Sequence, residues 1–275
     1  MKILRVVLYC LLGGLSLTPA ALGSGGFAWW WLAGIVLSAS FVPVALFGPR
    51  RAIFQFGVVA PVLLIVTVLC LWSEALIFVQ APEVQQHAVR DLVGASVIYL
   101  ILATVLAILA VLLKLPRVDG SKVEFRSASR VAPLVVVCGI AYVLYYLIFG
   151  SITYQFFTKG YYPDAPQIVA RLGIWFWLIQ IGRGVLMTLA ALPLICTLRM
   201  SRVQAAIAVG LIMWVAGGAA PLLLPNPSMV PAQRFIHTIE ILTQNVPLGI
   251  TMVVLLRAKQ PQSGMDLPVA APARR

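Results

Sequence analysis

The sequence consists of long apolar runs separated by short polar connections. Each run is about as long as the roughly 20 residues that a helix needs to cross a bilayer. Because lipid offers the backbone no hydrogen-bond partners, runs of this length predict helices rather than the alternating strands of a membrane barrel. The pattern therefore predicts an all-α, polytopic membrane helix bundle of about eight spans: 3–22, 27–47, 53–80, 92–114, 131–157, 168–198, 203–224 and 232–256.

Some runs carry further information about helix shape and packing. The runs 53–80 and 168–198 are longer than one crossing requires, so they are expected to tilt, kink or extend beyond the membrane. Pro61 and Pro193 are the expected kink points, because proline removes a backbone donor from a helix. The seventh run is expected to pack closely against a neighbour because it is rich in small residues, namely Gly210, Gly217, Gly218, Ala219 and Ala220.

Composition agrees with a membrane protein and leaves no material for a separate soluble domain. Hydrophobic residues make up 61% of the 275 residues, charged residues make up 10%, and the mean hydropathy is +1.00. A soluble domain would carry about 25% charged residues. The bundle, in contact with the lipid bilayer, is expected to occupy residues 1–257. The Pro- and Ala-rich segment 258–275 is expected to be a disordered cytoplasmic tail.

The distribution of Lys and Arg predicts the orientation in the membrane. Short loops rich in these residues stay in the cytoplasm, so both termini are expected there, in the inner membrane of a bacterial cell. The asymmetry explains the net charge of +12, and because the basic residues are scattered, no nucleic-acid partner is expected. Fifteen of the 20 basic residues fall on the predicted inner side: Lys2, Arg5, Arg50, Arg51, Lys114, Arg117, Lys122, Arg126, Arg130, Arg199, Arg202, Arg257, Lys259, Arg274 and Arg275.

The first 20 residues have a second interpretation. Lys2 and Arg5 precede an apolar run that ends in Leu-Thr-Pro-Ala, a pattern that also fits a cleavable signal peptide. Cleavage would leave seven spans and an outside N-terminus. An uncleaved first span is favoured, because the apolar run is longer than a usual signal core.

The sequence predicts neither a metal nor a cofactor. Of the two histidines, His87 lies in the connection 81–91 and is expected to be solvated, while His237 precedes Glu240 by three residues. One His with one or two acidic side chains provides fewer ligands than a protein metal site usually has. The four cysteines occupy separate apolar runs without metal-ligand spacing and are expected to be small buried hydrophobic residues: Cys10, Cys70, Cys138 and Cys196.

A polar stripe on the last apolar run is the main indication of function. At about 100° per residue, polar side chains between residues 234 and 245 fall on one side of a helix. A charged side chain at the centre of a membrane helix costs roughly 2.5–3.5 kcal/mol. The stripe is therefore expected to face the interior of the bundle, and it consists of Arg234, His237, Thr238, Glu240, Gln244 and Asn245.

Other spans place polar side chains at a similar depth. Glu74 lies near the outer end of the third span, and Gln180 and Arg183 lie three apart on one face of the sixth. Exposing these charges to lipid would cost roughly 10 kcal/mol, so Arg183 is expected to pair with Glu240 or Glu74, with His237 hydrogen-bonded nearby. The candidate binding site consists of Glu74, Gln180, Arg183, Arg234, His237, Glu240, Gln244 and Asn245.

Aromatic residues are concentrated on the same outer side. Six of the seven tryptophans fall near the outer ends of their spans. An interfacial belt explains this concentration, but it does not explain why the inner interface has almost none. The alternative is an outer vestibule that stacks on an amphiphilic or ring-containing ligand, lined by Tyr146, Tyr154, Trp175 and Trp177.

The connection before the polar helix, residues 225–231, contains three prolines and is expected to be stiff. Ser228 is the expected N-cap of the helix, and Pro231 is expected in its first turn. This arrangement would hold Arg234 and His237 in place at the mouth of a cavity. The alternative is an ordinary loop that only turns the chain.

Three functions from different classes fit this pattern. The first is transport or binding of a small or amphiphilic solute through a polar cavity open to the periplasm. In a transporter of this kind, Glu74 and Glu240 would exchange protons, and His237 would relay them. Arg183 would be a counter-charge or bind an anion. The second is a membrane-embedded enzyme acting on a lipid-linked substrate, with His237 as general base and Glu240 as its orienting partner. The third is a structural or assembly subunit whose network only fixes helix packing. The first is favoured because four spans contribute to the network, and no nucleotide-binding or hydrolase motif is present.

Overall fold

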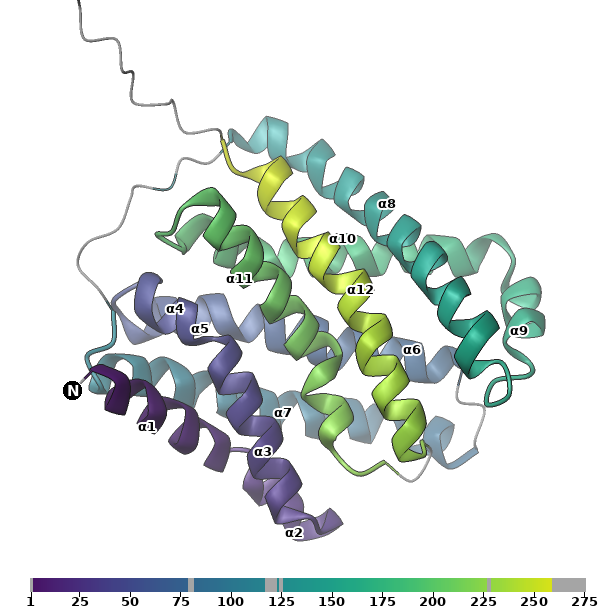
Figure 1. Ribbon diagram of the computed structural model, residues 1–275, viewed down its shortest axis with the longest axis horizontal. Helices are drawn as coiled ribbons and strands as arrows, with labels where there is room; N and C mark the ends of the chain where they lie inside the picture. Colours follow the sequence, from purple (N-terminus) through teal and green to yellow (C-terminus); the bar gives the residue numbers. More distant parts are fainter. Residues whose placement is uncertain (1, 79–81, 117–122, 124–125, 227–228, 259–275) are drawn as a thin grey trace, which may run out of the picture.

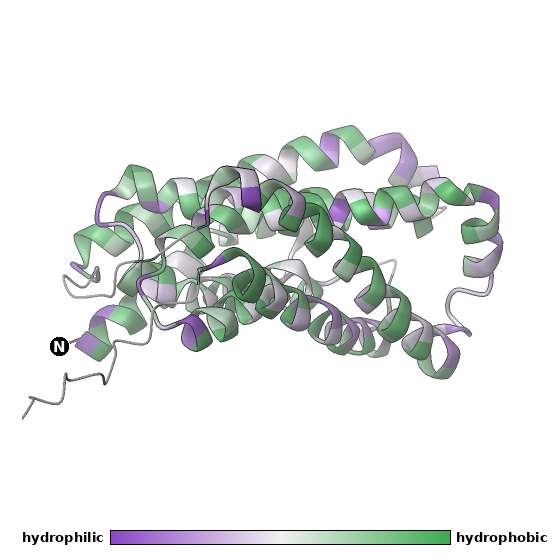
Figure 2. Ribbon diagram, turned by 90° about the horizontal axis from the view of Figure 1, so that it is seen from above, coloured by the Kyte–Doolittle hydropathy of each residue, from purple (hydrophilic) through white to green (hydrophobic). Residues whose placement is uncertain are grey.

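The computed structural model describes residues 2–78, 82–116, 123, 126–226 and 229–258. Within them it confirms the all-α polytopic bundle, because eight helical segments are long and apolar enough to cross a membrane and no β-strand is formed. Figure 1 shows their packing, and Figure 2 shows that hydrophobic residues predominate along the helices. The protein is a multi-pass integral membrane protein with the spans Lys2–Ala20, Phe27–Phe47, Ala52–Phe78, Gln85–Leu112, Ala128–Thr158, Ile174–Thr197, Arg202–Leu223 and Pro231–Leu256.

Most spans contain more than one helical element. The segments η1 and η5 are short 3₁₀ turns, and η2, η3 and η4 have the wider π-helical winding. In chain order the elements are α1 (Lys2–Leu15), η1 (Thr18–Ala20), α2 (Ala21–Ser24), α3 (Phe27–Ser40), α4 (Val42–Phe47), α5 (Ala52–Pro61), η2 (Val62–Cys70), α6 (Leu71–Phe78), α7 (Pro82–Leu112), α8 (Ala128–Thr153), η3 (Tyr154–Thr158), α9 (Ala165–Leu172), α10 (Ile174–Thr197), α11 (Arg202–Trp214), η4 (Val215–Ala219), η5 (Pro221–Leu223) and α12 (Pro231–Leu256).

The third span changes its winding at one of the two expected kink points. Pro61 ends α5, and the π-helical η2 follows before α6 resumes the α-helix. Proline cannot donate the backbone hydrogen bond that continues an α-helix. Pro193, in contrast, lies inside α10 without ending it. The chain therefore departs from regular α-helix directly before the segment that carries Glu74.

Two helix boundaries differ from the expected ones. The segment 82–91 is not a connection but the beginning of α7, because Pro82 suits the first position of a helix and good helix formers follow it. His87 is exposed on this helix. The long run 168–198 is not one helix, because Gly173 has a φ of 56° that breaks it into α9 and α10.

The start of α12 agrees in part with the expected stiff connection. Pro231 is the first residue of the helix, and the backbone N–H of Val230 donates to Gln233 Oε1 at 2.8 Å. Val230 therefore occupies the N-cap position, and Gln233 supplies only one half of a capping box, because the Val230 side chain has no acceptor for the other half. The expected N-cap, Ser228, lies outside the described residues, as does the expected tail beyond residue 258.

The connections gather at two ends of the bundle. The described chain ends lie at one end, together with the α4–α5 and α10–α11 connections (Figure 1). The connections that lead into α9 and into α12 lie toward the other end (Figure 1). Connections at alternating ends of the bundle are expected when eight successive spans cross the membrane. The basic residues of the predicted inner side that the structure describes thus belong to one end of the bundle.

Close glycine contacts set the position of α12, as the small residues of the seventh span predict. A Cβ atom added to Gly249 of α12 would lie 2.6 Å from the Cα of Gly210 in α11, so the two backbones touch. Gly218 approaches the Ile241 side chain in the same way. In lipid, such contacts replace the hydrophobic effect as a source of helix association.

Arg257 connects the C-terminal end of α12 to the C-terminal end of α10 through hydrogen bonds. It is only 4% exposed, and its guanidinium donates to the carbonyls of Ile195 at 2.9 Å, Leu198 at 2.6 Å and Met200 at 3.0 Å. A cation at a helix C-terminus satisfies carbonyls that have no partner within the helix. The helix that carries the polar stripe is therefore held at its C-terminal end as well as along its length.

Candidate functional site

Polar side chains from α6, α8 and α10 meet in one cluster. Arg183 Nη1 forms an ion pair with Glu74 Oε2 and donates to Gln180 Oε1 at 2.7 Å. Tyr146 donates its hydroxyl to the other oxygen of Glu74 at 2.9 Å. The Arg183 guanidinium also lies 5.7 Å from the ring centroid of Tyr142. We call Glu74, Tyr146, Gln180 and Arg183 the ion-pair cluster.

Local packing explains why these side chains can meet. Gln180 and Arg183 share the buried face of α10 with Phe176. A Cβ atom on Gly184 would lie 2.9 Å from the Cα of Gly139 in α8, so α8 and α10 touch directly beside Arg183. Tyr146 lies two helical turns beyond Gly139, which brings its hydroxyl to Glu74. The cluster therefore depends on a close helix contact.

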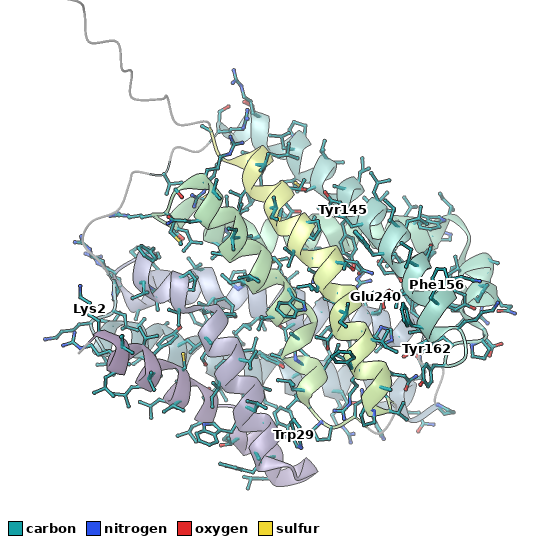
Figure 3. The ribbon with its side chains drawn as sticks, viewed as in Figure 1. Lys2, Trp29, Tyr145, Phe156, Tyr162 and Glu240 are labelled. Atoms are coloured by element: carbon teal, nitrogen blue, oxygen red, sulfur yellow. The ribbon has the colours of Figure 1, made fainter. Side chains whose placement is uncertain are left out.

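A second cluster joins α12 to the connection between η3 and α9. His237 Nδ1 lies 2.8 Å from Glu240 Oε2, and His237 Nε2 lies 3.3 Å from the Tyr162 hydroxyl. Gln244 donates to the other oxygen of Glu240 at 3.2 Å. Figure 3 shows Glu240 between α8 and α12 and Tyr162 near the beginning of α12. We call Tyr162, His237, Glu240 and Gln244 the histidine cluster.

The two clusters lie within electrostatic range of each other. Burial raises the pKa of Tyr162, which lies outside the spans, and the negative charges of Glu240 and Glu74 raise it further. Each carboxylate therefore influences the same hydroxyl. Both clusters are partly exposed: the side chains of His237 and Glu240 are 22% and 14% exposed, and that of Glu74 is 29% exposed.

Six of the eight candidate residues thus belong to these clusters, and two do not. Arg234 Nη1 donates to the carbonyl of Leu224 at 2.7 Å, which ties the beginning of α12 to the end of η5. Asn245 Nδ2 donates to the carbonyl of Met213 at 3.0 Å, which ties α12 to α11. The polar face of α12 is wide enough to contact both α8 and α11, so different residues of the stripe face different helices.

The four expected vestibule residues have different surroundings. Tyr146 belongs to the ion-pair cluster, and Trp177 packs edge-on against Phe176 with ring centroids 5.0 Å apart. Trp175 is 66% exposed, and Tyr154 is half-buried at the start of η3. A ligand-stacking role for these side chains stays a prediction.

Two contributors are not apparent from the sequence. Phe176 is 2% exposed and lies between Phe78 and Tyr146, with ring centroids 6.2 and 6.1 Å away. Its position one turn before Gln180 is the signal that could have indicated it. Tyr162 approaches His237 from a connection. The signal that could have indicated it is the aromatic residues close to it in the sequence, Phe156, Phe157 and Tyr161.

The described part of the chain contains no group of three His, Cys, Asp or Glu side chains that could hold a metal ion. Comparisons with protein-family models, with curated proteins and with solved structures found no match. The fold and the two clusters therefore define the class, a multi-pass integral membrane protein with ionisable side chains inside its spans.

Proposed function

We propose that the two clusters form the ligand site of an inner-membrane protein that transports or binds a small or amphiphilic solute, with the site open to the periplasm. The observation that carries this proposal is the partial exposure of ionisable side chains inside membrane spans, 22% for His237, 14% for Glu240 and 29% for Glu74. Ionisable side chains within spans are costly and usually mark ligand or ion pathways.

The contacts suggest different roles for the two acids. Glu74 is held by Arg183 and Tyr146, so it fixes α6 against α8 and α10. Glu240 is held only by His237 and by the neutral Gln244 among the described residues. We therefore assign proton or ligand exchange to the histidine cluster, and we assign to Arg183 the role of counter-charge for Glu74.

A membrane-embedded enzyme is the second candidate, and one contact favours it. The 2.8 Å distance from His237 Nδ1 to Glu240 Oε2 is the geometry by which a carboxylate orients a general base. In that case Nε2, which now contacts Tyr162, would face the substrate. Turnover of a lipid-linked substrate in detergent would support this candidate over transport.

A ligand that co-purifies with the protein would test the main proposal. We expect a small molecule to be extracted from wild-type protein in native lipid discs and to be lost from the Glu240→Gln variant, because that variant removes the carboxylate of the histidine cluster. Mass spectrometry of the extracts detects it. Asp91→Asn is the matched control, because Asp91 is an exposed acid on α7. Identical extracts from all three folded proteins would contradict the proposal.

We also propose that both termini are cytoplasmic, with the clusters nearer the periplasmic side. The grouping of basic residues at one end of the bundle supports this orientation. A topology reporter fused after residue 275 is expected to be active only in the cytoplasm, and one inserted within 225–231 only outside it. A periplasmic signal from the tail fusion would reverse the orientation and place the site on the cytoplasmic side.

A further inference from the structure

The charges around the histidine cluster do not balance. Arg183 is already paired with Glu74, and Arg234 is turned to the carbonyl of Leu224. Arg202 of α11 donates to the carbonyl of Val254, near the opposite end of α12. Among the described residues, Glu240 thus has no permanent cation beside it. One positive charge at this position, carried by a proton or by a ligand, would balance the Glu240 carboxylate.

The elements packed against α12 supply no other cation at this depth. They are α8, α10, α11, η3, η4 and η5. The described segments η4 and η5 contain only apolar residues and glycine. Of the titratable groups on these elements and on the neighbouring connection, Tyr142 and Tyr162 interact electrostatically with Glu240. The other titratable groups of that connection, Lys159, Tyr161 and Asp164, are exposed.

Two tyrosine side chains, Tyr142 and Tyr162, lie within electrostatic range of the Glu240 carboxylate. The Tyr162 ring lies 5.6 Å from the His237 ring, and the rings of Tyr142 and Tyr146 are 6.1 Å apart. The face of an aromatic ring attracts a cation most strongly where water is excluded. No side chain occupies position 150 of α8, because Gly150 stands there beside Glu240 and Gln244. The surroundings of Glu240 thus suit an organic cation better than an anion.

A buried donor provides a second, independent indication of a ligand. Gln180 is completely buried. Its Oε1 accepts from Arg183, but its Nε2 has no hydrogen-bond partner among the described residues. Leaving a buried donor unpaired is costly. An acceptor oxygen on a bound molecule would satisfy this donor.

We propose that the site binds a small organic cation, a substituted ammonium that also carries a hydrogen-bond-accepting oxygen, in exchange for one proton. This inference rests on the proposed function. When the ligand enters, its positive charge pairs with the Glu240 carboxylate, and the proton held by the His237–Glu240 pair leaves to water. The net charge of the site is then unchanged. The oxygen of the ligand accepts from Gln180 Nε2.

Two probes of equal shape and opposite charge test whether the site prefers a positively or a negatively charged ligand. We expect the purified protein to bind tetraphenylphosphonium but not tetraphenylborate in isothermal titration calorimetry. Titrations in buffers of different ionisation enthalpy should show about one proton released for each cation bound. Glu240→Gln is expected to weaken cation binding at least about tenfold, about 1.4 kcal/mol, and Glu240→Asp to retain it. Asp91→Asn controls for loss of an acid elsewhere.

A second pair of probes tests the acceptor oxygen. Acetylcholine and pentyltrimethylammonium have the same charge and chain length, but only the first carries oxygens. Acetylcholine is expected to displace tetraphenylphosphonium at a several-fold lower concentration, and Gln180→Leu is expected to remove the difference. Equal displacement by the two molecules would overturn the assignment of Gln180.

The outcomes separate this inference from the proposed function. Binding of tetraphenylborate alone, of neither probe, or of tetraphenylphosphonium equally by wild type and Glu240→Gln would overturn the cation inference. A co-purified ligand lost from Glu240→Gln would leave the proposed function standing in each case. The selectivity between tetraphenylphosphonium and tetraphenylborate is measured on the unmodified protein. It therefore tests whether the site prefers a cation even if a variant does not fold.

Discussion

Replacing Arg183 with alanine is expected to destabilise the folded protein by about 3–5 kcal/mol, the range for breaking a buried ion pair. Arg183 is 9% exposed and donates to both Glu74 and Gln180. Its loss leaves the Glu74 carboxylate without a counter-charge and the Gln180 oxygen without a donor. Denaturant titration of the purified variant in mixed micelles measures the free energy of unfolding.

The pairing partner of Arg183 can be tested by double substitution. Arg183→Met combined with Glu74→Gln should recover much of the lost stability, because the uncompensated charge is removed as well. Arg183→Met combined with Glu240→Gln should recover little, because Glu240 is bonded to His237 instead. Equal recovery by the two double variants would show that Arg183 does not discriminate between the two acids.

Hydropathy was sufficient to predict the eight spans, because the cost of exposing polar groups to lipid is a property of each segment alone. It was not sufficient at Gly173, where the chain breaks inside an apolar run. Ile168, Val169 and Leu172 extend that run, but they belong to the separate helix α9. A positive φ at one glycine is a conformational choice that hydropathy does not detect.

Depth arguments predicted that Arg183 pairs with Glu74 or Glu240 but could not choose between the two acids. Glu74 and Glu240 lie at similar depths, so either could pair with Arg183. The choice depends on the lateral order of helices, which places α6 beside Tyr146 of α8 and Arg183 of α10. Lateral order follows from contacts such as that between Gly139 and Gly184, whose partners cannot be identified from one sequence.

The polar stripe of α12 was predicted as one feature, but its residues bond to two different sets of neighbours. His237, Glu240 and Gln244 form hydrogen bonds with one another and with Tyr162, whereas Asn245 bonds to α11. Helical periodicity shows only that a face is polar. It cannot show which neighbour each part of a wide face will meet.

Glu240→Gln and His237→Ala are expected to abolish function while leaving the folded yield nearly unchanged. Glu240→Gln keeps the shape of the side chain and its bond with Gln244, but it removes the negative charge that a ligand or proton would meet. His237→Ala removes the contacts with both Glu240 and Tyr162. His87→Ala is the matched control for the histidine, because His87 is exposed on α7.

The most direct test of a functional site on α12 is complementation of a deletion strain by Glu240→Gln, measured against its folded yield by detergent size-exclusion chromatography. The proposed function predicts a variant that elutes as folded protein in near wild-type amount and fails to complement. A purely structural network predicts instead that activity falls only as far as the folded fraction falls. A folded Glu240→Gln protein that complements fully would contradict a functional site on this helix.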